Sequence, residues 1–134
     1  MKNNTIDQAT HKPKISFSIR LDGKIYFVLI ENIAFIYLDN ETVYLLDFSG
    51  NKHIINKTIS YLENLLPAQQ FYRINRQMIV NRQAIKEVEP YANQRISLQI
   101  SIPTSEQIIV PRLKVTHFVP RLKVTHFLHW VENG

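Results

Sequence analysis

Cysteine is absent from the 134-residue sequence, and glycine and long apolar runs are scarce. Without cysteine there can be no disulfide, no thiolate metal site and no cysteine nucleophile. The three glycines leave no glycine-rich loop that could hold a phosphate. No apolar run approaches the ~18 residues of a membrane-spanning helix, and the polar first residues lack the apolar core of a secretion signal. We therefore expect a cytoplasmic protein that does not enter a membrane.

Patterns typical of catalysis are also missing. The carboxylates are scattered, and Ser49-Gly50 lacks the flanking glycine of a nucleophile elbow. His126 and His129 are three positions apart on an expected helix, but the sequence offers no further ligand beside them. We expect these histidines to be solvated or to cap the helix. The sequence thus predicts neither an enzyme nor a bound metal or cofactor.

Positive charge is concentrated in the second half of the chain. The 16 Lys and Arg exceed the 11 Asp and Glu, which gives a net charge of +5. Residues 1–67 contain equal numbers of both signs, so the whole net charge comes from residues 68–134. This asymmetry favours a polyanion such as nucleic acid as the partner, although many ordinary domains are mildly basic as well.

Alternating apolar and polar residues predict a mostly β fold. The alternation is clearest over residues 15–21, and Asp22-Gly23 directly after it is a strong signal for a type I′ hairpin turn. Many short strands separated by turns are typical of an antiparallel domain. Further strands are predicted at residues 24–30, 33–38, 42–48, 52–55, 71–74, 85–89, 95–100 and 107–110.

One short helix interrupts the predicted strands. Apolar residues at three- and four-residue spacing over residues 59–66 predict about two helical turns, with Thr58 as the N-cap and Pro67 as the stop. Residues 1–14 are polar and have no periodicity, so we interpret them as a flexible tail or interdomain linker. Residues 15–134 have the length of a single domain.

A nine-residue segment near the C-terminus is duplicated. Residues 110–118 (VPRLKVTHF) recur unchanged at residues 119–127. Two copies of so short a unit do not indicate a repeat fold. Pro120 disfavours one unbroken helix through both copies, whereas the second copy continues into an apolar face that predicts a C-terminal helix.

Residues 71–81 (FYRINRQMIVN) form the most informative segment of the chain. A short strand leads into the polar turn Asn75-Arg76-Gln77, and an apolar stretch returns from it. Arg can form paired hydrogen bonds with guanine, and Asn or Gln with adenine, in the major groove of DNA. The same residues also suit an ordinary polar turn, so the segment alone leaves both interpretations open.

This segment resembles the signature of the LytTR DNA-binding domain, in which a strand ending in Phe-x-Arg precedes a short polar tip and an apolar-Val-Asn return. Residues 33–37 resemble the first core strand of that family, residues 58–66 its short helix, and residues 110–115 its closing Val-Ser-Arg segment. The resemblance covers about residues 15–134. It implies an elongated arrangement of small antiparallel sheets with one short internal helix and a C-terminal helix.

The resemblance also implies a function. Members of the family bind DNA through loops that reach successive major grooves, mostly as dimers on direct repeats and as output domains of bacterial response regulators. The implied partners are therefore double-stranded DNA and an upstream receiver domain or histidine kinase pathway.

Three regions of the family contact DNA: the turn after the first core strand, the tip of the signature, and the closing segment, for which either copy of the duplication qualifies. The corresponding candidates are Asn40, Thr42, Tyr44, Asn75, Arg76, Gln77, Arg112, Lys114, Arg121 and Lys123. Pro111 and Pro120 stand where the family usually has Ser, so a hydroxyl that could contact phosphate is absent.

We expect a sequence-specific DNA-binding transcription regulator, and two other interpretations remain open. A β-rich protein-interaction or ligand-sensing module would bind its partner with little dependence on salt. A single-stranded RNA-binding fold would need exposed aromatic rings on which bases stack. The candidate rings are those of Tyr26, Tyr37, Tyr44, Tyr61, Tyr72 and Tyr91.

Overall fold

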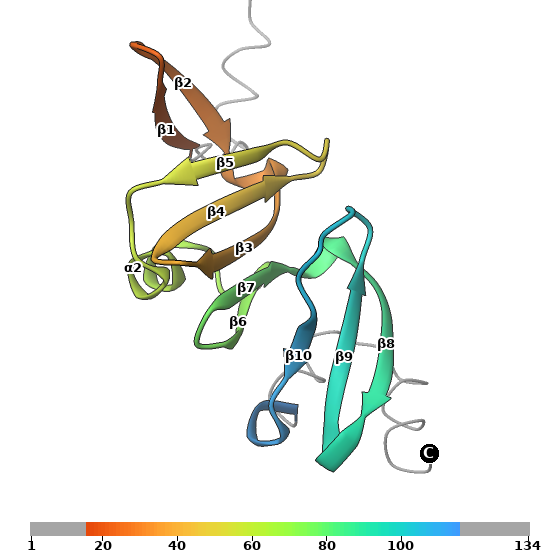
Figure 1. Cartoon of the computed structure of the whole chain (residues 1–134). Helices are drawn as coiled ribbons and strands as arrows, with labels where there is room; N and C mark the ends of the chain where they lie inside the picture. Colours follow the sequence, from red (N-terminus) through yellow and green to blue (C-terminus); the bar gives the residue numbers. More distant parts are fainter. Residues whose placement is uncertain (1–15, 116–134) are drawn as a thin grey trace, which may run out of the picture. The chain divides into compact units, whose positions relative to one another are not determined.

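The computed structural model describes residues 16–115, which fold into small antiparallel β-sheets (Figure 1). The mostly β fold predicted from the alternating pattern is confirmed. The predicted tail at residues 1–14, the second copy of the duplication with Arg121 and Lys123, and the predicted C-terminal helix beyond Val115 lie outside the described residues. The chain divides into two compact units, Met1–Glu31 and Asn32–Gly134, and each is described by itself.

The first unit contains a β-hairpin. Strand β1 (Ser16–Leu21) pairs antiparallel with β2 (Lys24–Leu29). The turn residues Asp22 and Gly23 have φ angles of 52° and 75°. A type I′ turn requires positive φ at both central positions, so the turn predicted from Asp22-Gly23 is confirmed. The short 3-10 segment η1 (Ile30–Asn32) follows the hairpin.

The second unit begins with a five-stranded antiparallel sheet in the order β5-β4-β3-β7-β6. Its strands are β3 (Ile33–Asp39), β4 (Thr42–Asp47), β5 (Lys52–Ile55), β6 (Phe71–Asn75) and β7 (Met78–Asn81). The central pairing of β3 with β7 joins distant parts of the chain. Asn81 secures this pairing because its fully buried amide Nδ2 donates to the carbonyl of Ile33 at 2.8 Å. Its Oδ1 accepts the N–H of Gln83 in η2 (Arg82–Ala84) at 2.9 Å.

Helix α2 (Ile59–Leu65) packs against β3, β6 and β7. The hydroxyl of Thr58 accepts the N–H of Tyr61 at 3.0 Å, which satisfies one of the unpaired donors at the start of the helix. Leu62 is fully buried on the inner face, and the helix ends before Pro67. The predicted helix, its cap and its stop are therefore confirmed.

A three-stranded sheet in the order β10-β9-β8 completes the second unit. Its strands are β8 (Ile85–Tyr91), β9 (Arg95–Ile100) and β10 (Ile108–Val110), with the 3-10 segment η3 (Ala92–Gln94) between β8 and β9. One apolar core joins this sheet to the five-stranded sheet. Its members include Phe35, Tyr37, Leu46, Ile74, Val80, Ile96, Leu98, Ile108 and Val110.

The first copy of the duplicated segment continues directly from β10. Val110 is the last residue of the strand, and its side chain is fully buried. Pro111 then precedes a helical segment that is described for residues 112–115, where Val115 is buried in the core. Pro suits this place because its missing N–H is not needed at the start of a helix.

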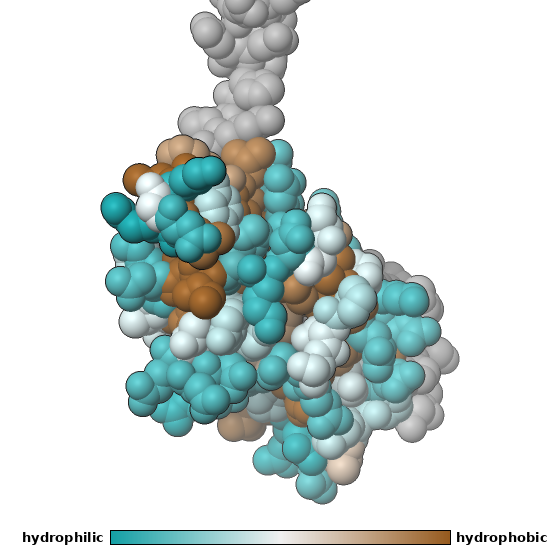
Figure 2. All heavy atoms as spheres, turned by 45° about the horizontal axis from the view of Figure 1, so that its top comes forward, coloured by the Kyte–Doolittle hydropathy of each residue, from teal (hydrophilic) through white to brown (hydrophobic). Residues whose placement is uncertain are grey.

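The surface mixes hydrophilic and hydrophobic side chains on the face shown in Figure 2. The large apolar residues that remain exposed are Leu21, Ile25, Phe27, Ile54, Tyr61, Leu65, Tyr91 and Leu113. Among the described residues, no helix has the length and apolar character needed to cross a membrane.

Candidate nucleic-acid interface

Two of the three predicted contact regions lie at the same end of the five-stranded sheet. Strand β3 ends at the β3–β4 turn (residues 40–41), and β7 begins after the tip (residues 75–77). Because β3 and β7 are antiparallel, with Tyr37 opposite Met78, these two turns are neighbours. The N–H of Leu38 donates to the carbonyl of Gln77 at 2.9 Å and links them directly.

A groove of about 680 Å³ opens at this end of the sheet. Its lining includes the cationic side chains of Lys57, Arg73 and Arg76, with the hydroxyls of Thr42 and Ser60 and one carboxylate, that of Glu41. Cations and hydroxyls are the usual partners of DNA phosphates. We refer to this feature as the basic groove.

Lys57 is a groove residue that the sequence analysis missed. It lies in the loop between β5 and α2, directly before the N-cap Thr58. The pairing of Ile55 in β5 with Val43 in β4 brings this loop to the same end of the sheet as the β3–β4 turn. The Lys57 Nζ lies 5.0 Å from the centre of the Tyr61 ring. A single Lys before a helix N-cap does not indicate, from the sequence alone, that its side chain will line a groove.

The tip presents two exposed side chains, those of Arg76 and Gln77. In the part of the chain that the structure describes, neither side chain has a hydrogen-bonding partner. Their guanidinium and amide groups therefore remain available for base edges, which Arg and Gln recognise through paired hydrogen bonds.

Asn75 is the third predicted residue of the tip, and its amide is engaged within the protein. Its Oδ1 accepts the N–H of Gln77 at 2.9 Å. Its Nδ2 donates to the carbonyl of Ile109 in β10 at 3.1 Å and lies 3.5 Å from the Sδ of Met78. Asn75 therefore shapes the turn and ties it to the three-stranded sheet.

The β3–β4 turn offers Asn40 and Thr42 rather than Tyr44. Asn40 is exposed and Thr42 is half-buried. The Tyr44 ring stacks on the Tyr37 ring with centroids 5.3 Å apart, and the Lys52 Nζ lies 5.0 Å from the Tyr44 centroid. A hydrogen bond with the Tyr37 hydroxyl raises the pKa of Lys52 above its ordinary value. The Tyr44 ring thus packs within the protein.

The third region follows β10. Arg112 is exposed and, with Arg95, lines a second hollow of about 570 Å³ beside the turn that contains Asn93. Lys114, in contrast, donates from Nζ to the carbonyl of Arg73 at 3.2 Å. Of the predicted cations in the first copy, Arg112 is therefore the more exposed one, and the Lys114 ammonium is partly engaged within the protein.

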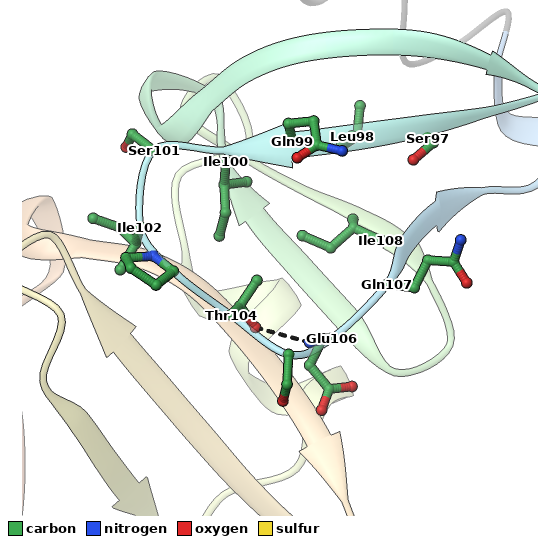
Figure 3. A pocket seen from close by; sticks show the side chains of 12 residues that line it. Ser97, Leu98, Gln99, Ile100, Ser101, Ile102, Thr104, Glu106, Gln107 and Ile108 are labelled. Carbon is green, nitrogen blue, oxygen red and sulfur yellow. Dashed lines mark hydrogen bonds between the residues drawn. The ribbon is translucent and has the colours of Figure 1, made fainter.

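The loop between β9 and β10 surrounds another hollow, of about 530 Å³ (Figure 3). The Thr104 hydroxyl accepts the N–H of Glu106 at 3.1 Å and shapes this loop. The lining contains hydroxyls, amides, isoleucines and the Glu106 carboxylate but no Lys or Arg. Such a surface does not suit a polyanion, so this hollow is not part of the interface.

Four of the six tyrosines that could offer a stacking surface to single-stranded RNA have rings engaged with other side chains. Tyr37 and Tyr44 stack on each other, and Tyr61 and Tyr91 are exposed but each carries a cation over its ring. The Arg95 guanidinium lies 4.8 Å from the Tyr91 centroid. Base stacking requires an aromatic face that is open to the base.

These observations define a DNA-binding class of protein, and comparison with known proteins gives the family. The model of the LytTr DNA-binding domain matches residues 23–123. The chain belongs to the LytTR family of DNA-binding domains, which is not a catalytic family. The resemblance inferred from residues 71–81 is confirmed.

A solved structure has a similar fold. It is the LytTr DNA-binding domain of a protein described as a methyl-accepting/DNA response regulator from Bacillus cereus. The TM-score is 0.70 at 19% sequence identity, and the match covers 84% of this chain and 100% of the other. No curated protein matches the chain significantly.

Proposed function

We propose that this chain recognises specific sites in duplex DNA and regulates bacterial transcription. Family membership supports DNA binding. The observation that carries the sequence-specific part is the exposure of Arg76, which lines the basic groove, and of its neighbour Gln77, with no hydrogen-bonding partner for either side chain in the described structure. Base readout needs such free, protruding donors, whereas the surrounding cations need only reach phosphates.

Each group at the interface has a distinct role in this proposal. Arg76 and Gln77 contact base edges in a major groove. Lys57 and Arg112 contact phosphates, and they supply much of the affinity and its salt dependence. A second set of contacts comes from Asn40 and Thr42, and in the second copy of the duplication from Arg121 and Lys123. Asn75, Tyr44 and Lys114 support the interface from within, because their polar groups or rings are engaged in the protein.

The cellular context follows from the same proposal. The domain is the output part of a two-component response regulator in the cytoplasm, and it binds direct repeats as a dimer. A receiver domain, controlled by a histidine kinase, acts upstream, and residues 1–14 serve as the linker to it. The similar Bacillus cereus domain comes from a protein described as a response regulator, which supports this context.

An electrophoretic shift assay over a series of salt concentrations tests the proposal. The probes are a duplex selected by this chain from a random-sequence pool, a scrambled duplex of the same length, and single-stranded competitors. We expect the selected duplex to bind best and the binding constant to fall steeply with salt. Binding that depends neither on salt nor on duplex DNA would instead indicate a protein-interaction module.

Replacing Arg76 tests the assignment of base readout. Arg76→Ala should weaken binding to the selected duplex by about 1–3 kcal/mol and should relax sequence preference. Lys86→Ala is the matched control, because Lys86 is an exposed cation on β8 and does not line the basic groove. Equal weakening on selected and scrambled duplexes would identify Arg76 as a phosphate contact.

A further inference from the structure

The Arg73 side chain forms four hydrogen bonds that link the tip to α2. Its Nε donates to the carbonyl of Asn75 at 3.1 Å, and its NH2 nitrogen donates to the carbonyl of Arg76 at 2.6 Å. Its NH1 nitrogen donates to the Ser60 hydroxyl at 3.2 Å and to the Glu63 carboxylate at 3.0 Å. All three guanidinium nitrogens thus bind the protein itself.

These bonds connect two elements that are separate in the sequence. Two of them hold backbone carbonyls of the tip, and the other two hold side chains of α2. The Arg73 side chain is 19% exposed, and its Glu63 partner is 47% exposed. Because an exposed ion pair alone contributes little, the importance of this arrangement lies in the geometry that it fixes.

The tip needs such support because its backbone is not the favoured one for a tight hairpin. Two-residue hairpin turns prefer positive φ at one or both central positions, which matches the twist of the strands. Arg76 and Gln77 do not have positive φ, and the β6–β7 pairing is irregular between Arg73 and Asn75. Side-chain hydrogen bonds to the turn therefore replace an intrinsic turn preference.

We propose that Arg73 is a positioning residue for DNA recognition, and that Glu63 on α2 acts through it. This inference rests on the proposed function of the tip. Arg73 lines the basic groove, but all except one of its N–H donors are engaged within the protein, so in this proposal it supports the tip rather than binding a phosphate. By holding the carbonyls of Asn75 and Arg76, it fixes the direction in which the Arg76 and Gln77 side chains leave the backbone. Small errors in that direction disrupt paired hydrogen bonds to a base edge.

The first experiment uses the free 134-residue protein and amide hydrogen exchange by NMR. The reporters are the N–H of Gln77, bound to Asn75, and the N–H of Leu38, bound to Gln77. Arg73→Lys keeps the charge but loses the planar fork, so we expect about tenfold faster exchange at both reporters with no change at Ile36. Unchanged exchange at the reporters would overturn the proposal. This measurement does not depend on DNA binding.

The second experiment compares binding to the selected duplex with binding to the scrambled duplex. For Arg73→Lys we expect the ratio of the two affinities to fall about tenfold, with an unchanged salt slope and scrambled-duplex binding within about twofold of the wild type. Equal weakening on both duplexes with a slope smaller by about one would show a phosphate contact and overturn the proposal. A wild-type protein without any preference would overturn the proposed function but leave the exchange result valid.

Glu63→Gln separates geometry from charge. Removing a carboxylate should tighten binding to all DNA if only charge matters. We expect instead that it lowers the selected-to-scrambled ratio about threefold, because a neutral amide oxygen holds the Arg73 guanidinium less firmly than the carboxylate does. Glu87→Gln is the matched control, since Glu87 is an exposed carboxylate on β8 outside the groove lining, and its ratio should not change. Equal ratios in the two variants would overturn the role of Glu63.

Discussion

The β3–β4 turn and the tip are two hairpin turns at the same end of one sheet, yet they are held in shape by different means. Asn40 and Glu41 have φ of 51° and 65°, so the backbone itself adopts the geometry of a type I′ turn. The tip lacks positive φ and depends on the side chains of Arg73 and Asn75. A turn shaped by its backbone is independent of its neighbours, whereas a turn shaped by side chains changes with the elements that supply them.

The difference also extends to charge and chemistry. The β3–β4 turn is flanked by Asp39 and contains Glu41, which suit a phosphate surface poorly. The tip contains Arg76 and Gln77 and is tied to both α2 and β10 through its supporting bonds. The geometry of the tip therefore depends on α2 and β10, whereas that of the β3–β4 turn is set by its own backbone.

Among the changes that test this comparison of the two turns, removal of the Asn75 amide should have the largest effect on stability. Asn75→Ala deletes the hydrogen bonds to Gln77 and Ile109, so we expect the free energy of unfolding to fall by about 2 kcal/mol. Urea denaturation measures this change. Gln77→Ala is the control, because that side chain has no partner in the described structure and should change stability by less than about 0.5 kcal/mol. Equal effects would show that the tip is not supported by Asn75.

The turn between β4 and β5 provides a second case of support by a side chain. The Asp47 Oδ1 accepts the N–H groups of Ser49 and Asn51, both at 2.9 Å, and its Oδ2 lies 2.8 Å from the Nε2 of His53. Burial of the carboxyl opposes ionisation, but the hydrogen bonds from His53 and the two N–H groups outweigh it and lower the pKa of Asp47 below its ordinary value. The ionised carboxyl therefore stabilises the folded protein.

This arrangement predicts an acid-sensitive contribution to stability. Because the folded-state pKa of Asp47 lies below 3.8, the contribution is complete above that pH and disappears as the pH falls through the lower, folded-state value. Asp47→Asn should lose about 1 kcal/mol at neutral pH and should unfold with a weaker pH dependence over about pH 5 to pH 2. Thermal unfolding across this range measures both. An unchanged pH profile would show that Asp47 does not contribute.

The smallest effects, of opposite sign, come from placing glycine in the two turns. Glu41→Gly should stabilise the protein by about 0.5 kcal/mol, since it removes the strain of a left-handed non-glycine residue. Gln77→Gly should destabilise it by about 0.5–1 kcal/mol, because glycine there adds only entropy to the unfolded chain. Shifts of the urea midpoint in the same direction for both variants would remove the distinction between the turns.

Local sequence signals predicted the elements whose causes are local. Asp22-Gly23 predicted the first hairpin, and Thr58 with Pro67 predicted both ends of α2, because turn geometry and helix capping depend on adjacent residues. The end of β8 was predicted less well: the strand extends through Pro90 to Tyr91, two residues beyond the expected boundary. Pro is tolerated there because β8 is an edge strand that pairs only with β9 in the described sheet.

The candidate site could be predicted only in part, because it depends on pairings between distant segments. The tip was predicted from residues 71–81, but the role of Asn75 depends on Ile109, which lies 34 positions away. Lys57 lines the groove because β5 pairs with β4. The Lys114 ammonium donates a hydrogen bond to the carbonyl of Arg73. None of these relations has a periodic or local signature in the sequence.

The bond between Asn81 and Ile33 spans 48 positions, and this separation has a consequence for folding kinetics. Neighbouring hairpins close short loops and form early, whereas the union of β3 with β7 must wait until the intervening chain has been brought together. The β3–β4 turn can therefore form in a partly folded chain, but the tip reaches its place beside this turn only when β3 has paired with β7. On the proposed function, specific DNA binding therefore requires that the pairing of β3 with β7 is complete.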